Sequence, residues 1–261
     1  MLYFFLVNIA KTNDDCSIFY CEFCKMSSTT GSLLLFPLPI GELSGGQFET
    51  DYFKNELKST KIWVAENART LRRYISALSL GIVIDELNIL ELSFHTEQKD
   101  IEEFLDLNSS SGKIGLCSEA GLPCVADPGN KVVMWAQRRN WNVVPLLGPN
   151  SIIMALQGSG FNGQQFVFHG YFPLKEDAIR VWHKDFHQSS LKKYTHIFIE
   201  TPYRTDKTLR LLLKTLTDNT KLCIAAGLHT NNQSIRTLTV AQWKKNTPEF
   251  GKIPVVFVIA N

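Results

Sequence analysis

An apolar strand, a conformationally restricted loop and an amphipathic helix follow one another between residues 113 and 139. The strand covers 113–117. The loop covers 118–129 and holds two glycines, two prolines and the carboxylates of Glu119 and Asp127. In open α/β sheets, ligands bind beside the loops that leave the carboxyl ends of strands. Because this loop is both restricted and acidic, it indicates a site for a polar, cationic or nucleoside-like ligand.

Short apolar runs alternate with amphipathic segments up to residue 156. The runs predict strands at 33–36, 61–65, within 87–94, 113–117 and 142–147, and the segments predict helices at 49–57, 67–78, 97–107, 130–139 and 150–156. We expect Asp127 to cap the helix at 130–139, with Pro128 at its first position, and Asn150 or Ser151 to cap the next helix. Such alternation predicts a largely parallel sheet covered by helices on both faces.

The rhythm changes after residue 160. Strands are expected at 165–171, 194–200, 221–226, 234–239 and 253–259, with helices at 175–191, 206–216 and 241–245. Several of these strands follow each other without a long helix between them, which favours a mixed sheet. The fold class is therefore α/β, with a mainly parallel N-terminal domain over 32–147, a mixed C-terminal domain over 148–261 and a cleft between them.

The first 25 residues differ from the rest of the chain. Residues 1–10 are apolar, but they are too few to cross a bilayer and lack the basic start of a signal peptide. Cys21 and Cys24 form a CxxC pair without a second pair of ligands, which is a weak sign of zinc or redox chemistry. Met26 begins a more ordinary sequence, so residues 1–25 are expected to be a non-native or disordered, dispensable extension.

Composition and missing motifs exclude several classes of protein. The hydrophobic content of 44% and charged content of 20% are typical of a globular chain, and a net charge of +2 gives no chain-wide signature of nucleic-acid binding, although it leaves room for a local basic patch. The six cysteines are too sparse for a disulfide scaffold, so Cys117, Cys124 and Cys223 are expected to be reduced packing residues. No dinucleotide-binding glycine motif, P-loop, nucleophile elbow or zinc-protease motif occurs, and the six histidines show no metal-ligand spacing.

Six short motifs occupy residues 36–41, 65–73, 118–129, 148–151, 170–173 and 200–204. In this order and at these separations they resemble the motifs of the tetrapyrrole methylase superfamily of S-adenosylmethionine (SAM)-dependent methyltransferases. Within that superfamily the chain is most similar to the RsmI-type branch of bacterial 16S rRNA ribose 2′-O-methyltransferases. Two motifs depart from that branch: Asn67 stands where the branch has Asp, and Glu119 replaces a shorter Asp.

The resemblance implies an enzyme that is cytoplasmic, homodimeric and not bound to a membrane, with the small ribosomal subunit as its RNA substrate. It implies that SAM lies folded in the cleft between the two domains. Glu119 would lie near the charged end of SAM, where a carboxylate can offset a sulfonium or ammonium. The cofactor-binding residues that the resemblance implies are Pro39, Gly41, Glu119, Ala120, Gly121, Pro123, Gly148, Ser151 and Ile199.

Methyl transfer is a direct displacement at carbon, for which the protein mainly supplies alignment. A ribose hydroxyl also needs a base to take its proton, and the candidates are Glu66, His95 and Glu119. Arginine binds phosphate groups in a bidentate manner, so the substrate-binding candidates are Arg69, Arg72, Arg73 and Arg204. A solvated helix face would equally explain the first three arginines, and an ion pair at a helix start would explain Arg204.

Three functions remain open from the sequence. The chain ends after the strand at 253–259, where RsmI-type proteins carry a further small domain, so the resemblance is to a short form that lacks this C-terminal domain. An RNA methyltransferase is the leading hypothesis. A methyltransferase for a tetrapyrrole precursor is the alternative, because the superfamily also performs that chemistry. A SAM-binding module without catalysis is a third, which the altered acids Asn67 and Glu119 permit.

Overall fold

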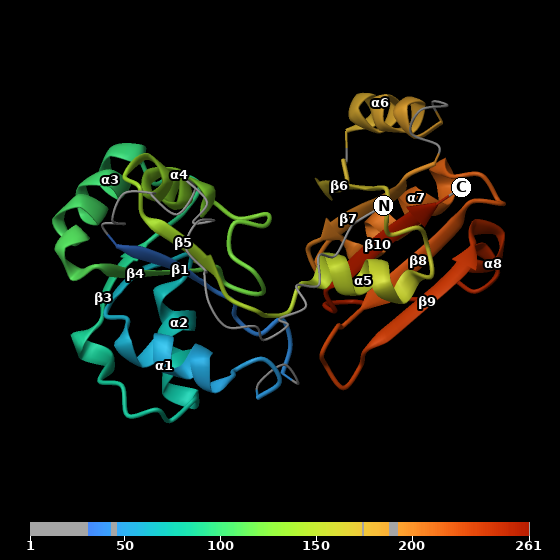
Figure 1. Ribbon diagram of the computed structural model, residues 1–261. Coiled ribbons are helices and arrows are strands. Elements are labelled where there is room, and N and C mark those ends of the chain that lie inside the picture. Colours follow the sequence, from blue (N-terminus) through green and yellow to red (C-terminus); the bar gives the residue numbers. More distant parts are fainter. Residues whose placement is uncertain (1–30, 43–45, 174, 188–192, 261) are drawn as a thin grey trace, which may run out of the picture.

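The computed structural model describes residues 31–42, 46–173, 175–187 and 193–260, which form two five-stranded sheets flanked by helices (Figure 1). The expected extension over 1–25 and the Cys21–Cys24 pair lie outside these residues. The two sheets, one parallel and one mixed, confirm the predicted α/β fold class. In the part of the chain that is described, no helix is long and apolar enough to cross a membrane.

The first sheet is entirely parallel, with the strand order β3-β2-β4-β1-β5. Its strands are β1 (Ser32–Phe36), β2 (Ile62–Ala65), β3 (Asn88–Glu91), β4 (Lys113–Cys117) and β5 (Asn142–Pro145). All five strands lie where the alternation of apolar and amphipathic segments predicts them. Parallel strands need crossover connections, and helices provide these here.

Helices cover both faces of this sheet (Figure 1). They are α1 (Asp51–Ser59), α2 (Ala68–Ala77), α3 (Gln98–Leu107) and α4 (Asn130–Arg138). Successive side chains of a strand point to opposite faces, so Leu34 of β1 packs with α1 and α2 while Leu33 packs with α3 and α4. Trp63 and Trp135 are fully buried, one on each face.

The second sheet is mixed, with the order β6-β7-β10-β8-β9 and one parallel pair, β6 with β7. Its strands are β6 (Phe166–Tyr171), β7 (Thr195–Glu200), β8 (Lys221–Ala226), β9 (Ser234–Thr239) and β10 (Val255–Ala260). One face packs against the helices α6 (Glu176–His187), α7 (Thr205–Thr215) and α8 (Val240–Lys245). The other face packs against α5 (Ser151–Ser159).

The structure settles the caps of two helices: the cap of α4 differs from the expected one, and the cap of α5 is one of the two expected residues. Gly129, not Asp127, is the N-cap of α4, and Pro128 precedes the helix. The Asp127 prediction was wrong because the chain makes one more turn after it, so its Oδ1 atom accepts a hydrogen bond from the backbone N–H of Gly129 at 2.7 Å. Asn150 caps α5, since its Oδ1 atom accepts from the backbone N–H groups of Ile152 and Ile153, both at 3.0 Å.

The loop after β1 contacts the 118–129 loop, the loop after β5 and, through Gly41, the backbone of Leu228 and His229. Leu38 and Gly121 exchange two backbone hydrogen bonds of 2.9 Å, and Gly121 adopts a φ of +72°, which suits glycine. A Cβ atom on Gly148 would lie 2.2 Å from the Pro37 side chain, so only glycine allows this close approach. These contacts fix the loops that leave the carboxyl ends of β1, β4 and β5.

Candidate functional site

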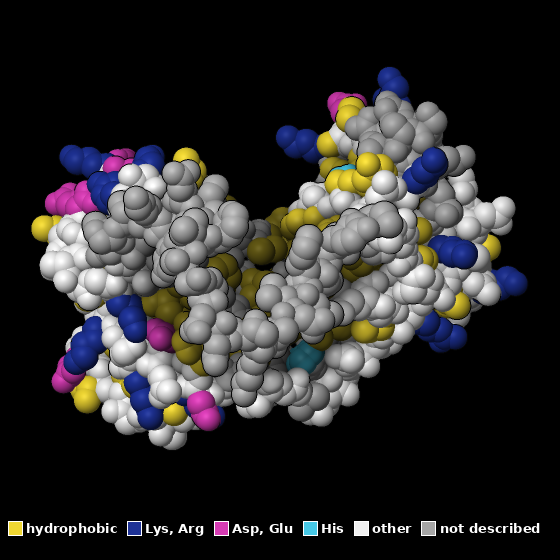
Figure 2. All heavy atoms as spheres, in the orientation of Figure 1, with side chains coloured by type: hydrophobic (Ala, Val, Ile, Leu, Met, Phe, Trp, Pro, Cys, Tyr) yellow, Lys and Arg dark blue, Asp and Glu magenta, His cyan; other side chains and the backbone are white. Residues whose placement is uncertain are grey.

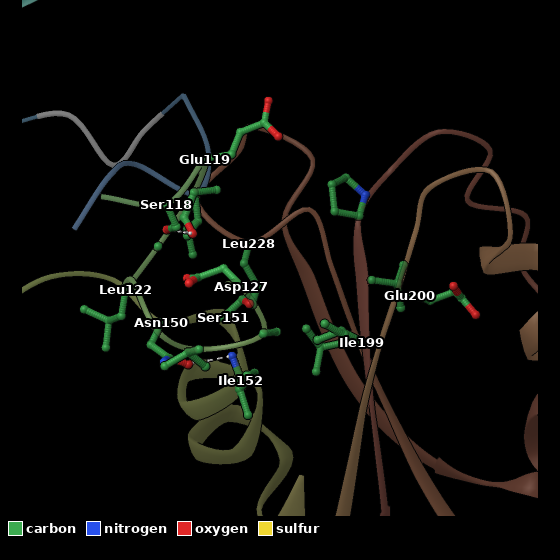
Figure 3. A pocket seen from close by; sticks show the side chains of 18 of the residues that line it. Ser118, Glu119, Leu122, Asp127, Asn150, Ser151, Ile152, Ile199, Glu200 and Leu228 are labelled. Atoms are coloured by element: carbon green, nitrogen blue, oxygen red, sulfur yellow. Dashed lines mark hydrogen bonds between the residues drawn. The ribbon is translucent and has the colours of Figure 1, made fainter. Parts of the chain in front are cut away.

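A cavity of about 350 Å³ lies at the carboxyl ends of β1, β2 and β4, and residues of both sheets line it (Figure 3). The first sheet contributes Ile40, Glu66 and eight residues of the 118–127 segment. The second sheet's side contributes the start of α5, the ends of β6, β7 and β8, and the start of β10. Figure 2 shows apolar side chains in the recess between the two halves. The site is therefore shared by the two parts of the chain.

One wall of the cavity is acidic. The Glu66 Oε2 atom accepts a 2.9 Å hydrogen bond from the backbone N–H of Glu119, and the Glu119 Oε1 atom lies 3.4 Å from the side-chain amide of Asn67. Figure 3 shows the Glu119 carboxylate directed away from Ser151. Glu66 and Asp127 thus line the wall from partly buried positions, whereas Glu119 is exposed at the rim.

The pKa of the Glu66 carboxyl is raised above its ordinary value of 4.5. Burial is the main cause, and the negative charges of Asp127 and Glu119 add to it, while the hydrogen bond from the Glu119 N–H acts in the opposite direction. A carboxyl group with a raised pKa accepts a proton more readily near neutral pH than an ordinary one. This property is the one that a general base requires.

Asp127 has an unused acceptor beside the cavity. Its Oδ2 atom is buried and accepts no hydrogen bond from the described residues. Buried polar atoms are almost always paired, so this oxygen is positioned to accept a hydrogen bond or positive charge from a ligand. The neighbouring Cys124 and Ala126 have φ values of +68° and +65°, which are strained for residues with side chains. The strain holds the Asp127 loop in an uncommon path.

The cysteines near the site are packing residues, as the sequence predicts. Cys117 and Cys223 are buried, and Cys124 is partly buried. Burial, together with the negative charge of Asp127, raises the pKa of the Cys124 thiol to about 12. Such a thiol stays protonated at neutral pH and is a poor nucleophile or metal ligand. Within the described part of the chain, no group of His, Cys, Asp and Glu residues suits a metal ion.

The opposite wall is apolar and comes from the second sheet and α5. Ile152 and Leu228 are buried, Ile199 is partly buried and Tyr171 is half exposed at the rim. Ser151 also lines the cavity, next to the capping residue Asn150 (Figure 3). A cavity with an acidic wall, an apolar wall and a few hydroxyl and backbone groups matches an elongated ligand that has a cationic end and a flat, less polar end.

Arg204 lies outside the lining of the cavity and is paired within the protein. Its guanidinium donates a 3.0 Å hydrogen bond to the Glu200 carboxylate and another to the Phe172 carbonyl. The side chain of Glu200 is fully buried and also accepts from the Thr208 hydroxyl at 2.7 Å. This geometry is that of an ion pair at the start of α7, one of the two alternatives for Arg204.

Other predicted residues lie beside the cavity or away from it. Of the predicted cofactor contacts, Glu119, Ala120, Gly121, Ser151 and Ile199 line it, whereas Pro39, Gly41, Pro123 and Gly148 do not. Gly41 instead packs against the backbone of Leu228 and His229. His95 lies exposed in the loop after β3, outside the lining. The roles assigned to these residues stay predictions.

The three arginines of α2 lie close to the site in the chain. They are exposed, lie on α2, which begins two residues after Glu66, and form no ion pair within the described residues: Arg69, Arg72 and Arg73. Their exposure leaves the guanidinium groups available to a ligand, and it also fits a solvated helix face. They are close to Glu66 in the chain, and none of them lines the cavity.

One wall of the cavity was not predicted from the sequence. Residues after β8 and at the start of β10 line the cavity, and none of them was a candidate: Ala225, Gly227, Leu228, Thr230, Pro254, Val255 and Val256. The only local signal is the small-residue run Ala225–Gly227 at the end of an apolar strand. Their place follows from the antiparallel pairing of β10 with β8, which is a long-range contact.

Several proteins of known name are similar to this chain in amino-acid sequence. No protein-family model matches the chain. The ribosomal RNA small subunit methyltransferase I of Streptococcus pyogenes serotype M3 (strain ATCC BAA-595 / MGAS315) is 31% identical over 193 residues, which are 72% of this chain and 62% of that protein. Proteins of the same name from Buchnera aphidicola subsp. Schizaphis graminum (strain Sg) and Bacillus subtilis (strain 168) are 28% and 29% identical, over 88% and 73% of this chain and 78% and 62% of theirs.

Solved structures share the fold. The methyltransferase CobJ has a TM-score of 0.56 at 15% identity, over 90% of this chain and 95% of that chain. The precorrin-6Y methylase (cbiE) from Archaeoglobus fulgidus has a TM-score of 0.50 at 14% identity, over 88% and 98%. This chain spans 62% of the length of the first curated relatives it matches. The chain is therefore similar in sequence to the proteins named ribosomal RNA small subunit methyltransferase I, and it shares its fold with the solved methyltransferases.

Proposed function

We propose that the chain is a SAM-dependent methyltransferase that acts on RNA, with a ribose 2′-hydroxyl of the small ribosomal subunit as the acceptor. The observation that carries the proposal is the cavity at the carboxyl ends of the parallel sheet, lined by the 118–127 segment and by Ser151. The relatives by sequence are named ribosomal RNA small subunit methyltransferase I, which supports RNA as the substrate class.

The residues around the cavity fit SAM. A volume of about 350 Å³ falls within the usual range for small-molecule sites, which is about 300–1,000 Å³. The unused Oδ2 atom of Asp127 and the carboxyl of Glu66 favour a cationic group, and SAM carries a sulfonium and an ammonium. The apolar wall with Ile199 and Leu228 favours a flat ring such as adenine. Ala120, Gly121 and Ser151 would add backbone and hydroxyl contacts.

The chemistry divides between the cofactor and the protein. SAM, when bound, supplies the methyl group of its sulfonium. The protein aligns the acceptor hydroxyl with that group and keeps water out of the recess. Glu66 is our candidate for the base that takes the hydroxyl proton, because burial and two neighbouring carboxylates raise its pKa. The exposed carboxylate of Glu119 and the exposed His95 stay alternatives for this step.

The arginines of α2 support an anionic substrate. Arg69, Arg72 and Arg73 are exposed and follow Glu66 in the chain, so a phosphate that they hold would lie close to the acidic wall. Bidentate arginine contacts to phosphate position a nucleic acid without reading its sequence. In this proposal the arginines hold the RNA backbone, while Arg204 stabilises the second sheet.

The proposal also includes the organisation of the enzyme. We assign the two sheets to domains over 32–147 and 148–261, with SAM between them, and we propose a cytoplasmic homodimer. The order of the two sheets along the chain supports the domain division. The homodimer and the location rest on the family resemblance. Sedimentation velocity of the purified chain, with and without SAM, tests the oligomeric state: a single monomeric species would contradict the homodimer.

The function is tested by transfer of labelled methyl from SAM to small ribosomal subunits that lack their own 2′-O-methylation. The proposal expects label in the RNA with the natural chain and a loss of about 100-fold or more with Glu66→Gln. Glu86→Gln, in an exposed pair with Lys61, is the matched control and keeps full activity. Binding of SAM without label in RNA would contradict the RNA proposal, and label in a tetrapyrrole acceptor offered in parallel would replace it.

A further inference from the structure

A groove of about 430 Å³ runs between α6 and α7. Its apolar floor includes Ile179 and Leu211, and its rim carries the cationic side chains Arg180, Lys184 and Lys214 with His183. Among the residues that the structure describes, no acidic side chain lines the groove. Arg180 lies 4.0 Å from Asp177, and both side chains are highly exposed, so this pair is weak.

The charges of the chain are divided unevenly between its two halves. Residues 148–261 contain fourteen Lys and Arg against seven Asp and Glu, whereas residues 32–147 contain eleven against fifteen. The second half is therefore clearly positive in a chain whose net charge is only +2. Figure 2 shows Lys and Arg side chains spread over this half, with few Asp or Glu on the same face. An asymmetry of this kind favours a polyanionic partner for the positive half.

The two helices that form the groove start near the cavity, although they pack on the face of the second sheet opposite to α5. The helix α6 starts five residues after Tyr171, and α7 starts five residues after Glu200, and both of these residues line the cavity. Leu211 and Lys214 lie six and nine residues into α7, which places them about 9–14 Å along the helix. A strand of RNA that left the groove past the starts of α6 and α7 would therefore reach the end of the sheet where the cavity lies.

We propose that the groove between α6 and α7 binds the phosphate backbone of the RNA substrate and feeds it toward the cavity. The inference rests on the proposed function, to which it adds a second contact surface. Lys and Arg side chains bind phosphates by charge and release the counterions of the nucleic acid. The groove offers two such side chains, Lys184 and Lys214, which form no ion pair within the described residues.

A second copy of the chain is a poorer occupant. In a two-fold symmetric dimer, the same surface patch of each subunit meets the other. The cationic rim of this groove would then face its own copy, with no described acidic side chain in the lining to offset it. Like charges held together at an interface are costly. The charge pattern therefore favours a polyanion over self-association at this surface.

The test compares two double substitutions with the same loss of charge. Lys184→Gln with Lys214→Gln alters the groove. Lys221→Gln with Lys245→Gln alters exposed residues of the same half outside the groove. Binding of a short fluorescein-labelled single-stranded RNA is measured by anisotropy over a range of salt concentrations. We expect the groove variant to bind about ten-fold more weakly and to lose about 1.4 from the slope of log affinity against log salt, as two phosphate contacts would give. The control stays within about two-fold.

Other readouts separate this inference from the proposed function. SAM binding by calorimetry is expected to be equal in the natural chain and both variants. If the two variants bind RNA and transfer methyl equally well, the groove assignment is wrong, although the methyltransferase proposal stands. If the groove variant becomes monomeric while its RNA binding is unchanged, the groove is an interface between copies and the inference is overturned. If no chain methylates RNA while RNA binding still depends on the groove, the groove stands and the proposed function falls.

Discussion

At the scale of single residues, Glu66 combines partial burial, a hydrogen bond from the Glu119 N–H and two neighbouring carboxylates. Its pKa is raised, so methyl transfer that uses it as a base should increase with pH through that raised pKa. In Glu66→Gln, the side-chain oxygen can still accept the Glu119 N–H, but the base is lost. We expect activity to fall about 100-fold or more and the acidic limb of the pH profile to disappear. An unchanged limb would assign the base to another residue.

The same raised pKa has a consequence for stability. The folded chain holds the Glu66 proton more tightly than the unfolded chain, so folding is favoured while Glu66 is protonated. That advantage is lost as pH rises from the ordinary value of 4.5 through the folded pKa. The free energy of unfolding in urea, measured at a pH below 4.5 and at a pH above the folded pKa, should therefore fall more in the natural chain than in Glu66→Gln.

Arg204 illustrates a buried pair that a single substitution would break. Glu200 is fully buried, and Arg204 supplies its counter-charge and a hydrogen bond to the Phe172 carbonyl. Arg204→Ala should destabilise the chain by about 3 kcal/mol, because Glu200 would remain buried without its partner. Arg210, on the same helix, pairs with Glu249 at 3.2 Å in an exposed position, so Arg210→Ala should cost less than about 1 kcal/mol. Equal losses in denaturant unfolding would contradict this account of Arg204.

At the scale of elements, two neighbouring residues at the start of α5 have different roles: Asn150 stabilises the helix, and Ser151 lines the cavity. Asn150 caps the helix with two hydrogen bonds of 3.0 Å, and Ser151 makes no cap. Asn150→Ala should lower the free energy of unfolding by about 1 kcal/mol. Ser151→Ala should leave stability nearly unchanged and weaken SAM binding by a few fold, since Ser151 lines the cavity. Thermal unfolding measures the stability of both variants, and calorimetry measures their SAM binding. A loss of stability in Ser151→Ala, with weaker SAM binding in Asn150→Ala, would contradict these roles.

The elements themselves could be predicted from the sequence, because apolar periodicity and glycine or proline at the ends are local signals. All ten strands and the eight α-helices of the described part lie within a few residues of their expected positions. The cap at Asp127 was wrong because the chain makes one more turn between Asp127 and the start of α4. The path before that turn, through the positive φ values of Cys124 and Ala126, has no local signal either, since neither residue is glycine or asparagine.

At the scale of the whole molecule, the candidate site depends on how the two halves meet. Among the residues predicted from the motifs, Glu66, Glu119, Gly121 and Ser151 line the cavity. Four others do not, namely Pro39, Gly41, Pro123 and Gly148, and the roles of all of them stay predictions. The wall from β8 and β10 could not be predicted, because it forms by pairing of strands that are about thirty residues apart. Arg204 shows the converse limit: a motif residue that resembled a substrate contact is held by a buried glutamate. Local sequence motifs can therefore predict the loops of a site, whereas the residues on the opposite wall depend on how the strands of the second sheet pair.

The central claim is that this cavity holds SAM. The most direct test is calorimetric titration of SAM into the natural chain and into Ala120→Trp, which places a large ring at an exposed position in the cavity lining. Ala77→Trp, exposed at the end of α2 outside the cavity, is the matched control. The account predicts saturable binding to the natural chain and to the control, and a loss of at least about ten-fold with Ala120→Trp, whose thermal stability stays unchanged. Equal binding to all three chains, or no binding to the natural chain, would contradict it.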